Sequence, residues 1–209
     1  MEVKTLSQFK SKLQGGGARP DLFEVSIPAF PAAVSGDWSP SDDGENGTFR
    51  FLCTAAQLPA STVGMINVPF RGRELKVAGE RTFENWVVTV INDEDFKLRT
   101  AFEKWANALS RLSDNTGVTE PSSYMADAYV QQLGRGREAF ADKNSGGEVS
   151  VLRTYRFYDI WPTNVGAIQL SYDQTGDIER FDVEFAVQYF TIGDSPESTG
   201  GNPGEERIN

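Results

Sequence analysis

Three consecutive acidic residues are the first candidates for chemistry in this sequence. Asp93, Glu94 and Asp95 could form a cation site or a pair of catalytic carboxylates. They stand directly before an amphipathic segment, where acidic side chains stabilise the positive end of a helix. We therefore predict that this acidic run serves a helix start, with Asn92 or Asp93 as the capping residue.

Other kinds of catalytic or cofactor site find little support. The chain contains no histidine, which removes Ser-His-Asp sites, Cys-His sites and histidine metal ligands. The segment 134–139 fits the pattern G-x-G-x-x-A, but a polar Gly/Ser stretch follows it instead of the helix that a dinucleotide site requires. The single cysteine, Cys53, lies in an apolar run and is predicted to be a buried hydrophobic side chain. We expect no metal, no cofactor and no catalytic residue.

Composition limits the partners of the chain. Thirty acidic and twenty basic residues give a formal charge of −10, which disfavours a protein that grips nucleic acid through a basic stripe. A 39% apolar content over 209 residues is sufficient for a large core. The start has no apolar signal core, and no apolar run is long enough to span a bilayer, so we expect no membrane anchor.

Alternating apolar residues predict a mainly β fold, an antiparallel β-barrel or sandwich with one flanking α-helix. The segment 82–92 is apolar on both faces, which predicts a central strand covered on both sides. The expected strands are 21–30, 49–57, 82–92, 124–134, 149–161, 167–172 and 180–191.

In one segment the spacing of apolar residues changes to that of a helix. Apolar residues spaced by four, three, four and three positions predict an amphipathic helix over 94–112. Its core-facing residues are expected to be Leu98, Phe102, Trp105 and Leu109, continued by Leu112.

The chain is predicted to form one domain with two mobile ends. Residues 1–18 are expected to form a mobile arm or short helix, because GGGARP interrupts the pattern there. Residues 19–192 form the β domain. Residues 193–209 are rich in Gly, Pro, Ser and Glu, which is typical of a flexible tail.

A basic island stands in this acidic chain. Residues 60–80 hold two strand-like pieces around Arg71-Gly72, which predicts a projecting hairpin. Residues 71–81 carry four basic and two acidic residues, a net charge of +2, whereas residues 21–48 carry six acids and no base, −6. Residues 177–209 carry eight acids and two bases, again −6. Such separated charges favour head-to-tail contacts between copies of the chain, which generate rings or filaments.

The segment WPTNVG at 161–166 is predicted to be a stiff turn. Proline fixes φ and holds the preceding Trp161 extended, while Asn164 and Gly166 tolerate positive φ. One interpretation is an internal hairpin. The other is a rigid corner that holds two strands in register near a subunit boundary.

Long motifs in this sequence resemble the tail tube proteins of contractile-tailed bacteriophages of the T-even type. The similarity runs from about Arg19 to Phe190. It rests on LPASTVGMINVPFRGRELKVAGERTFENWVVTVIND (58–93), FEKWANAL (102–109) and WPTNVGAIQLSYD (161–173).

The resemblance implies a structural protein, not an enzyme. Family members form a small β-barrel or sandwich with an outer helix, the fold shared with the inner tube of type VI secretion systems. Six copies form a ring, and rings stack into the inner tube of the tail, through which the genome is ejected. The implied partners are other copies of the chain, the sheath, baseplate and tail terminator proteins, a tape measure protein inside the tube, and double-stranded DNA in passage without specific binding. The implied location is the virion tail, after assembly in the host cytoplasm.

Within such a tube, residues of the segments singled out above have expected roles. The hairpin is expected to make the contact between stacked rings, through Arg71, Arg73, Glu74 and Lys76. The subunit-boundary corner would be Trp161, Pro162, Asn164 and Gly166. Asp182 and Glu184 are candidate acids of the lumen, where negative charge would repel phosphates and let DNA slide.

Three alternatives remain open from the sequence. The same tube could belong to a type VI or extracellular contractile injection system that carries protein effectors. A monomeric β-barrel could bind a sugar or another small ligand. A hydrolase could use paired carboxylates, although no pair stands out.

Overall fold

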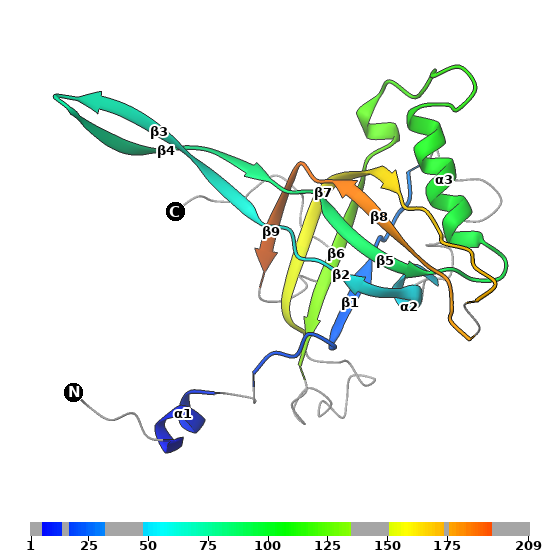
Figure 1. The fold of residues 1–209 in the computed structure, drawn as a ribbon, viewed down its shortest axis with the longest axis horizontal. Coiled ribbons are helices and arrows are strands. Elements are labelled where there is room, and N and C mark those ends of the chain that lie inside the picture. Colours follow the sequence, from blue (N-terminus) through cyan, green and yellow to red (C-terminus); the bar gives the residue numbers. More distant parts are fainter. Residues whose placement is uncertain (1–5, 14–16, 32–47, 135–150, 174–175, 194–209) are drawn as a thin grey trace. The chain divides into compact units, whose positions relative to one another are not determined.

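The computed structural model describes residues 6–13, 17–31, 48–134, 151–173 and 176–193 (Figure 1). Strands dominate, and the pairings whose registers are defined are antiparallel, so the predicted mainly β class is confirmed. The elements in chain order are α1 (Leu6–Lys12), β1 (Phe23–Ser26), α2 (Thr48–Leu52), β2 (Cys53–Ala56), β3 (Ser61–Phe70), β4 (Arg73–Phe83), β5 (Trp86–Ile91), α3 (Lys97–Leu109), η3 (Pro121–Ser123), β6 (Ala126–Leu133), β7 (Val151–Val165), β8 (Arg180–Ala186) and β9 (Tyr189–Gly193).

The chain divides into two compact units. The smaller unit comprises Met1–Glu24, Gln131–Tyr155 and Ile192–Asn209. Within it the amide of Gln132 donates hydrogen bonds to the carbonyls of Arg19 and Leu22. The larger unit comprises Val25–Val130 and Arg156–Thr191, and it contains the hairpin, α3 and most of the strands.

The main sheet has the strand order β1-β6-β7-β8-β5-β2, and β9 pairs with β7. The predicted central position of β5 is confirmed, because it lies between β2 and β8. Its inward side chains, Trp86, Val88 and Val90, are buried. The side chains on its other face are only half-buried, so the prediction that both faces are covered is wrong for the single chain.

An aromatic cluster forms the core between α3 and the sheet. The ring of Phe102 lies 6.4 Å from that of Phe181 and 5.9 Å from that of Phe185, both on β8. The indole of Trp86 stacks on Phe157 with a centroid separation of 4.9 Å. All five side chains are buried. Phe102, which touches several rings of this cluster, is the residue that fastens the helix to the sheet.

Three of the four predicted core residues of the helix are confirmed as buried: Leu98, Phe102 and Trp105. Leu109 is half-buried. The helix is shorter than the predicted 94–112. It ends at Leu109, and Leu112 is 95% exposed, because the side chain of Asn107 accepts the hydrogen bond from the Leu112 amide and turns the chain away.

Two predicted strands differ near the hairpin. The first half of 49–57 is the short helix α2, whose Phe49 packs edge-on against Phe102 with centroids 5.7 Å apart. A short apolar run does not distinguish a buried helix from a strand. The segment 82–92 is also divided, since β4 ends at Phe83 and β5 begins at Trp86.

The remaining strands differ from the predictions mainly at their ends. The segments 21–30 and 124–134 are shortened to β1 and β6, and 167–172 is not a strand. The segment 180–191 is broken into β8 and β9. The predicted helix near the N-terminus is present as α1. The segment 135–139 of the G-x-G-x-x-A match, most of the acidic loop 31–48 and the tail from 194 onward lie outside the described residues.

Candidate assembly surfaces

The predicted hairpin is present as a long ribbon, β3 paired with β4, that points away from the main sheet (Figure 1). Its turn consists of Arg71 and Gly72, with φ of 46° and 82°. Two consecutive positive φ angles are typical of the tight turns whose twist matches a β-hairpin, and glycine is suited to the second position. The turn therefore holds its basic residue at the tip of the ribbon.

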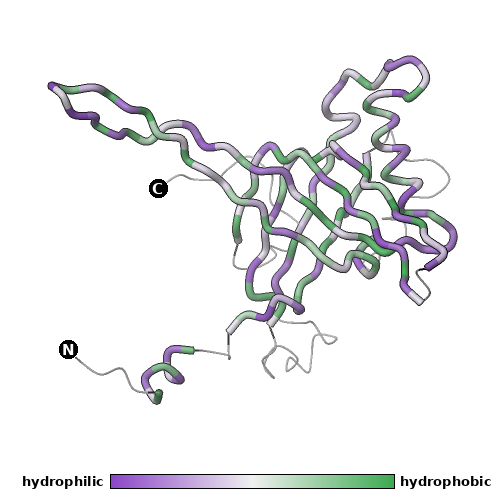
Figure 2. The backbone as a smooth tube through the Cα atoms, in the orientation of Figure 1, coloured by the Kyte–Doolittle hydropathy of each residue, from purple (hydrophilic) through white to green (hydrophobic). Residues whose placement is uncertain are grey.

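The two faces of the ribbon differ in chemistry. Cross-strand partners share a face, so the pairs Ile66–Val77 and Val68–Leu75 lie together with Phe70. Green and purple alternate along both strands in Figure 2. These five side chains are between 43% and 66% exposed. We call them the apolar face of the ribbon.

The predicted ring-stacking residues lie at the outer end of the ribbon. Arg71 occupies the turn, and its guanidinium lies 5.5 Å from the centre of the Phe70 ring. Arg73 pairs with Phe70 and so borders the apolar face, whereas Glu74 and Lys76 lie on the opposite face. All four are exposed, so the tip combines apolar contact area with positive charge.

A two-stranded ribbon is marginally stable alone in water, and a contiguous exposed apolar face marks an interaction surface. Both strands of the ribbon have ten or more residues. The most direct physical account is that another molecule covers the apolar face.

The predicted turn at WPTNVG is wrong. β7 continues through this segment to Val165, where Trp161 pairs with Ala186 on β8, and a bulge follows Pro162. Proline has no backbone N–H to donate to the neighbouring strand, so it is tolerated in a sheet at a bulge. Neither Asn164 nor Gly166 has a positive φ.

Gly166 is instead required by a close approach. Its amide donates a hydrogen bond to the carbonyl oxygen of Asp182 at 2.7 Å. A Cβ atom on Gly166 would lie 2.8 Å from that oxygen, closer than any real side chain permits. The end of β7 is therefore held in a fixed geometry, although by contact and not by turn chemistry.

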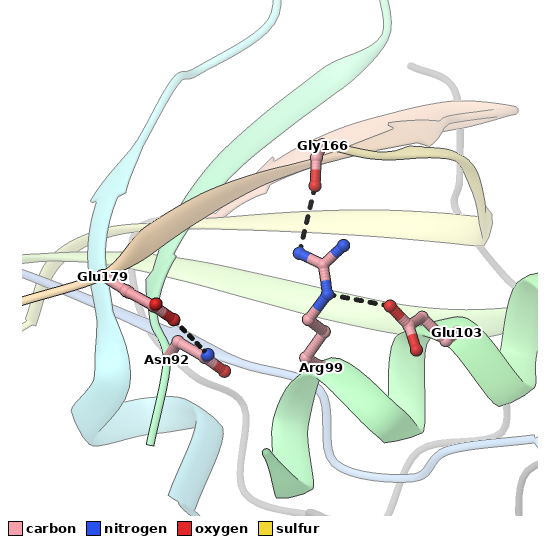
Figure 3. A network of polar contacts seen from close by, with 5 residues as sticks. All are labelled: Asn92, Arg99, Glu103, Gly166 and Glu179. Carbon is pink, nitrogen blue, oxygen red and sulfur yellow. Dashed lines mark hydrogen bonds and ion pairs between the residues drawn. The ribbon is translucent and has the colours of Figure 1, made fainter. Parts of the chain in front are cut away.

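Arg99 of α3 also holds the chain at Gly166. The sequence patterns did not reveal this role of Arg99. Its Nη1 donates to the carbonyl of Gly166 at 3.1 Å, and its Nε donates to Glu103 at 2.8 Å (Figure 3). The guanidinium also lies 5.2 Å from the centre of the Phe181 ring. The side chain is only 18% exposed, so these interactions are shielded from water.

Arg99→Met is expected to reduce the free energy of unfolding by about 1.5–3 kcal/mol, because it removes charge-assisted hydrogen bonds and keeps the aliphatic stem. Urea denaturation measures the change. Lys104→Met, at an exposed position of the same helix, is the control and is expected to change little. Equal stability of the two variants would show that Arg99 does not hold the end of β7.

The candidate lumen acids lie on the face of β8 opposite the core. Phe181, Val183 and Phe185 are buried, so the alternate residues Asp182 and Glu184 point the other way. Thr89 donates to Asp182 at 2.6 Å, and Asn85 donates to Glu184 at 2.8 Å. Both carboxylates are held in place and remain accessible to solvent.

A second polar cluster on the face opposite the core was also missed. The guanidinium of Arg156 pairs with Asp127 at 2.8 Å and lies 4.5 Å from the centre of the Tyr158 ring. Tyr158 in turn stacks on Tyr189 at 4.4 Å. These residues come from β6, β7 and β9, so only the sheet order brings them together.

The structure describes two of the catalytic candidates, the acidic run at 93–95 and Cys53. The prediction that Asn92 or Asp93 is the capping residue is wrong, because α3 begins at Lys97 and its N-cap is Phe96, which makes no side-chain capping hydrogen bond. Asp93 still accepts a hydrogen bond from the amide of Lys97 at 3.1 Å, from outside the helix. Burial raises the pKa of the Cys53 thiol to about 12, so it is not a nucleophile at neutral pH. In the described ranges, no group of three or more Cys, Asp or Glu residues could hold a metal ion. No helix in that part of the chain is long and apolar enough to cross a membrane.

Known proteins with similar sequences are tail components of phages. The tail tube protein gp19 of Enterobacteria phage T4 is 34% identical over 176 residues, which cover 84% of this chain and 92% of that protein. The tail tube protein of Serratia phage KSP90 is 25% identical over 191 residues, 90% of this chain and 96% of that protein.

Solved structures share the fold at low sequence identity. A chain of the sheath–tube complex of the extracellular contractile injection system PVC, in its extended state, has a TM-score of 0.57 and 11% identity, over 92% of this chain and 100% of that chain. A chain of the anti-feeding prophage baseplate has a TM-score of 0.55 and 13% identity, over 84% of this chain and 95% of that chain.

The family model for phage tail tube proteins matches residues 18–193, which include the ribbon, α3 and the strands of the main sheet. The chain therefore belongs to the phage tail tube protein family.

Proposed function

We propose that copies of this protein form six-membered rings that stack into the inner tube of a contractile phage tail, through which double-stranded DNA leaves the capsid. The tube-forming part is residues 19–192. The observation that carries the proposal is the exposed apolar face of the ribbon, in a chain that belongs to the phage tail tube protein family. When rings stack, a neighbouring ring covers the apolar face of the ribbon.

The ends of the main sheet support ring closure. β1 and β2, the end strands in the sheet order, have four residues each. Unpaired strand edges readily add a strand from another chain. Pairing between neighbouring copies would continue the sheet around a ring, and six chains together would enclose a bore wide enough for water. We propose that the end of β7 and the following Gly166, the segment 161–166, lie near a subunit boundary, and a purely internal role is the alternative.

The remaining roles follow from the family. The protein is a structural component of the virion tail without enzymatic activity or cofactor, and it assembles in the host cytoplasm. Its partners are the tail sheath, the baseplate, the tail terminator and a tape measure protein inside the tube. The related folds in the PVC sheath–tube complex and the anti-feeding prophage baseplate support contact with sheath and baseplate components.

Sedimentation velocity over a concentration series, with and without phage baseplates, tests the proposal. We expect fast-sedimenting assemblies, at least when baseplates are present. A strict monomer under every condition would overturn the proposal and favour a ligand-binding module.

The acids opposite the core are proposed to line the bore. Replacing Asp182 and Glu184 with lysine is expected to slow DNA ejection several-fold while tubes still form, because a positive wall would attract phosphates. Dye fluorescence on released DNA measures the rate. The control, Asp182→Asn with Glu184→Gln, removes charge without reversing it and should slow ejection less. Unchanged ejection in the lysine variant would remove both residues from the lumen.

The second candidate is the inner tube of a contractile injection system that carries protein. The fold shared with the PVC complex favours it. The contents of particles purified with the tube distinguish the two functions: nucleic acid supports the phage tail and protein cargo supports the injection system.

A further inference from the structure

Two connections lie side by side in the larger unit. Residues 92–96 join β5 to α3, and residues 166–179 join β7 to β8. The amide of Asn92 donates to the carbonyl of Glu179 at 2.9 Å, and the Asn92 side chain donates to the Glu179 carboxylate at 2.8 Å (Figure 3). The two connections therefore meet at Asn92 and Glu179, and we call their described residues, 92–96, 166–173 and 176–179, the acidic end.

The acidic end carries strong negative charge. Residues 92–97, 166–173 and 176–180 contain six acids and two bases, Lys97 and Arg180, a net charge of −4. Lys97 pairs with Asp95 at 2.9 Å, and the nearby Arg99 is bonded to Glu103 and Gly166. The acids of this surface therefore outnumber its bases by six to two.

The same surface exposes large apolar side chains. Leu170 is 80% exposed and Tyr172 is fully exposed, whereas Phe96 and Ile178 are 45% and 64% exposed. Phe96, directly before α3, has a left-handed backbone conformation with φ of 54°. A surface that combines exposed apolar side chains with a single sign of charge is suited to bind a partner of the opposite sign.

We infer that the acidic end is the receptor for the ribbon of another copy of this chain. The ribbon offers an apolar face of five side chains, bordered by Arg73 and ending in Arg71. Residues 71–76 carry three bases and one acid, a net charge of +2. The ribbon is thus the counterpart of the acidic end in both apolar character and charge.

The geometry favours a head-to-tail contact. The ribbon extends from one side of the larger unit, while the connection between β7 and β8 lies at the other side, next to the start of α3 (Figure 1). One copy cannot bring the two surfaces together within itself, but a row of copies can, with each copy as both donor and receptor. This inference rests on the proposed tube and names the partner surface of its stacking contact.

Disulfide capture tests the pairing directly. Val68→Cys and Leu170→Cys are made in separate chains, each carrying Cys53→Ala, and tubes assembled from an equal mixture are treated with a thiol oxidant. We expect crosslinked dimers from the mixture and none from tubes of the Val68→Cys chain alone. Leu112→Cys replaces Leu170→Cys as the control, because Leu112 is exposed and follows the opposite end of α3. Equal crosslinking to position 112, or none to position 170 within intact tubes, would overturn the inference.

Charge exchange gives a second readout. Arg73→Glu and Asp177→Arg alter exposed side chains, and each alone is expected to prevent long tubes. The double variant restores opposite charges and should recover tube length. Failure of the double variant, with each single variant correctly folded, would overturn the pairing of these surfaces. Absence of tubes from the unmodified protein would instead contradict the proposed function itself.

Discussion

Phe102→Ala is expected to reduce the free energy of unfolding by about 3–5 kcal/mol, because it removes a buried ring and leaves a cavity. The Phe102 side chain is fully buried, and its ring centroid lies 6.0 Å from Phe30, 5.7 Å from Phe49 and 5.9 Å from Phe185. These partners come from three separate parts of the chain, so no single local shift can fill the space. Urea denaturation followed by tryptophan fluorescence measures the loss.

The matched control is Leu112→Ala. Leu112 lies just beyond the same helix but is 95% exposed, and its truncation is expected to change stability by no more than about 0.5 kcal/mol. A Phe102→Ala variant that lost under about 1 kcal/mol would be inconsistent with a well-packed core, where deletion of an aromatic ring costs several times more.

The second large effect concerns assembly. Arg71→Glu with Arg73→Glu is expected to leave rings intact and to prevent long tubes, because it reverses the charge at the tip of the ribbon without touching the core. Both side chains are exposed, so thermal stability should be unchanged. Electron microscopy measures tube length.

Lys104→Glu with Arg111→Glu is the control for this variant. It makes the same change in net charge at exposed positions on and just beyond α3, and normal tubes are expected. Long tubes from the ribbon variant would show that its basic residues are not needed for stacking. Loss of tubes in both variants would indicate a general effect of net charge.

Features that depend on local chemistry were predictable from the sequence. The hairpin was identified because Arg71-Gly72 separates two strand-like segments, and a tight turn needs only its own residues to form. The buried face of α3 followed from the spacing of Leu98, Phe102 and Trp105. The family resemblance, based on long motifs in the same segments, is confirmed by the match over residues 18–193.

Features that depend on distant partners were not predictable. Proline, asparagine and glycine in residues 162–166 suggested a turn, yet β7 continues because its partner strand β8 defines the register. Arg99 gave no sign of its role, since the Gly166 carbonyl it binds is 67 positions away in the chain. Pattern and spacing describe a segment, whereas strand pairing and close backbone contacts belong to the whole sheet.

The charge pattern was likewise predictable within single segments and not predictable between distant ones. The sequence identified the basic island at residues 71–81 and acidic segments elsewhere, which predicted a head-to-tail contact. It did not indicate that the two connections meet at Asn92 and Glu179, because the hydrogen bonds between these residues form across the fold. Two acidic segments noted in the sequence contribute to this surface, the run Asp93–Asp95 and the start of the segment 177–209.

The central claim is that the protein forms a hollow tube from copies of itself. Negative-stain electron microscopy of the purified protein, over a concentration series and with phage baseplates as nucleators, tests it most directly. The account predicts rings or tubes with a stain-filled bore and sixfold end views. Single particles without a bore at every concentration, even on baseplates, would contradict it.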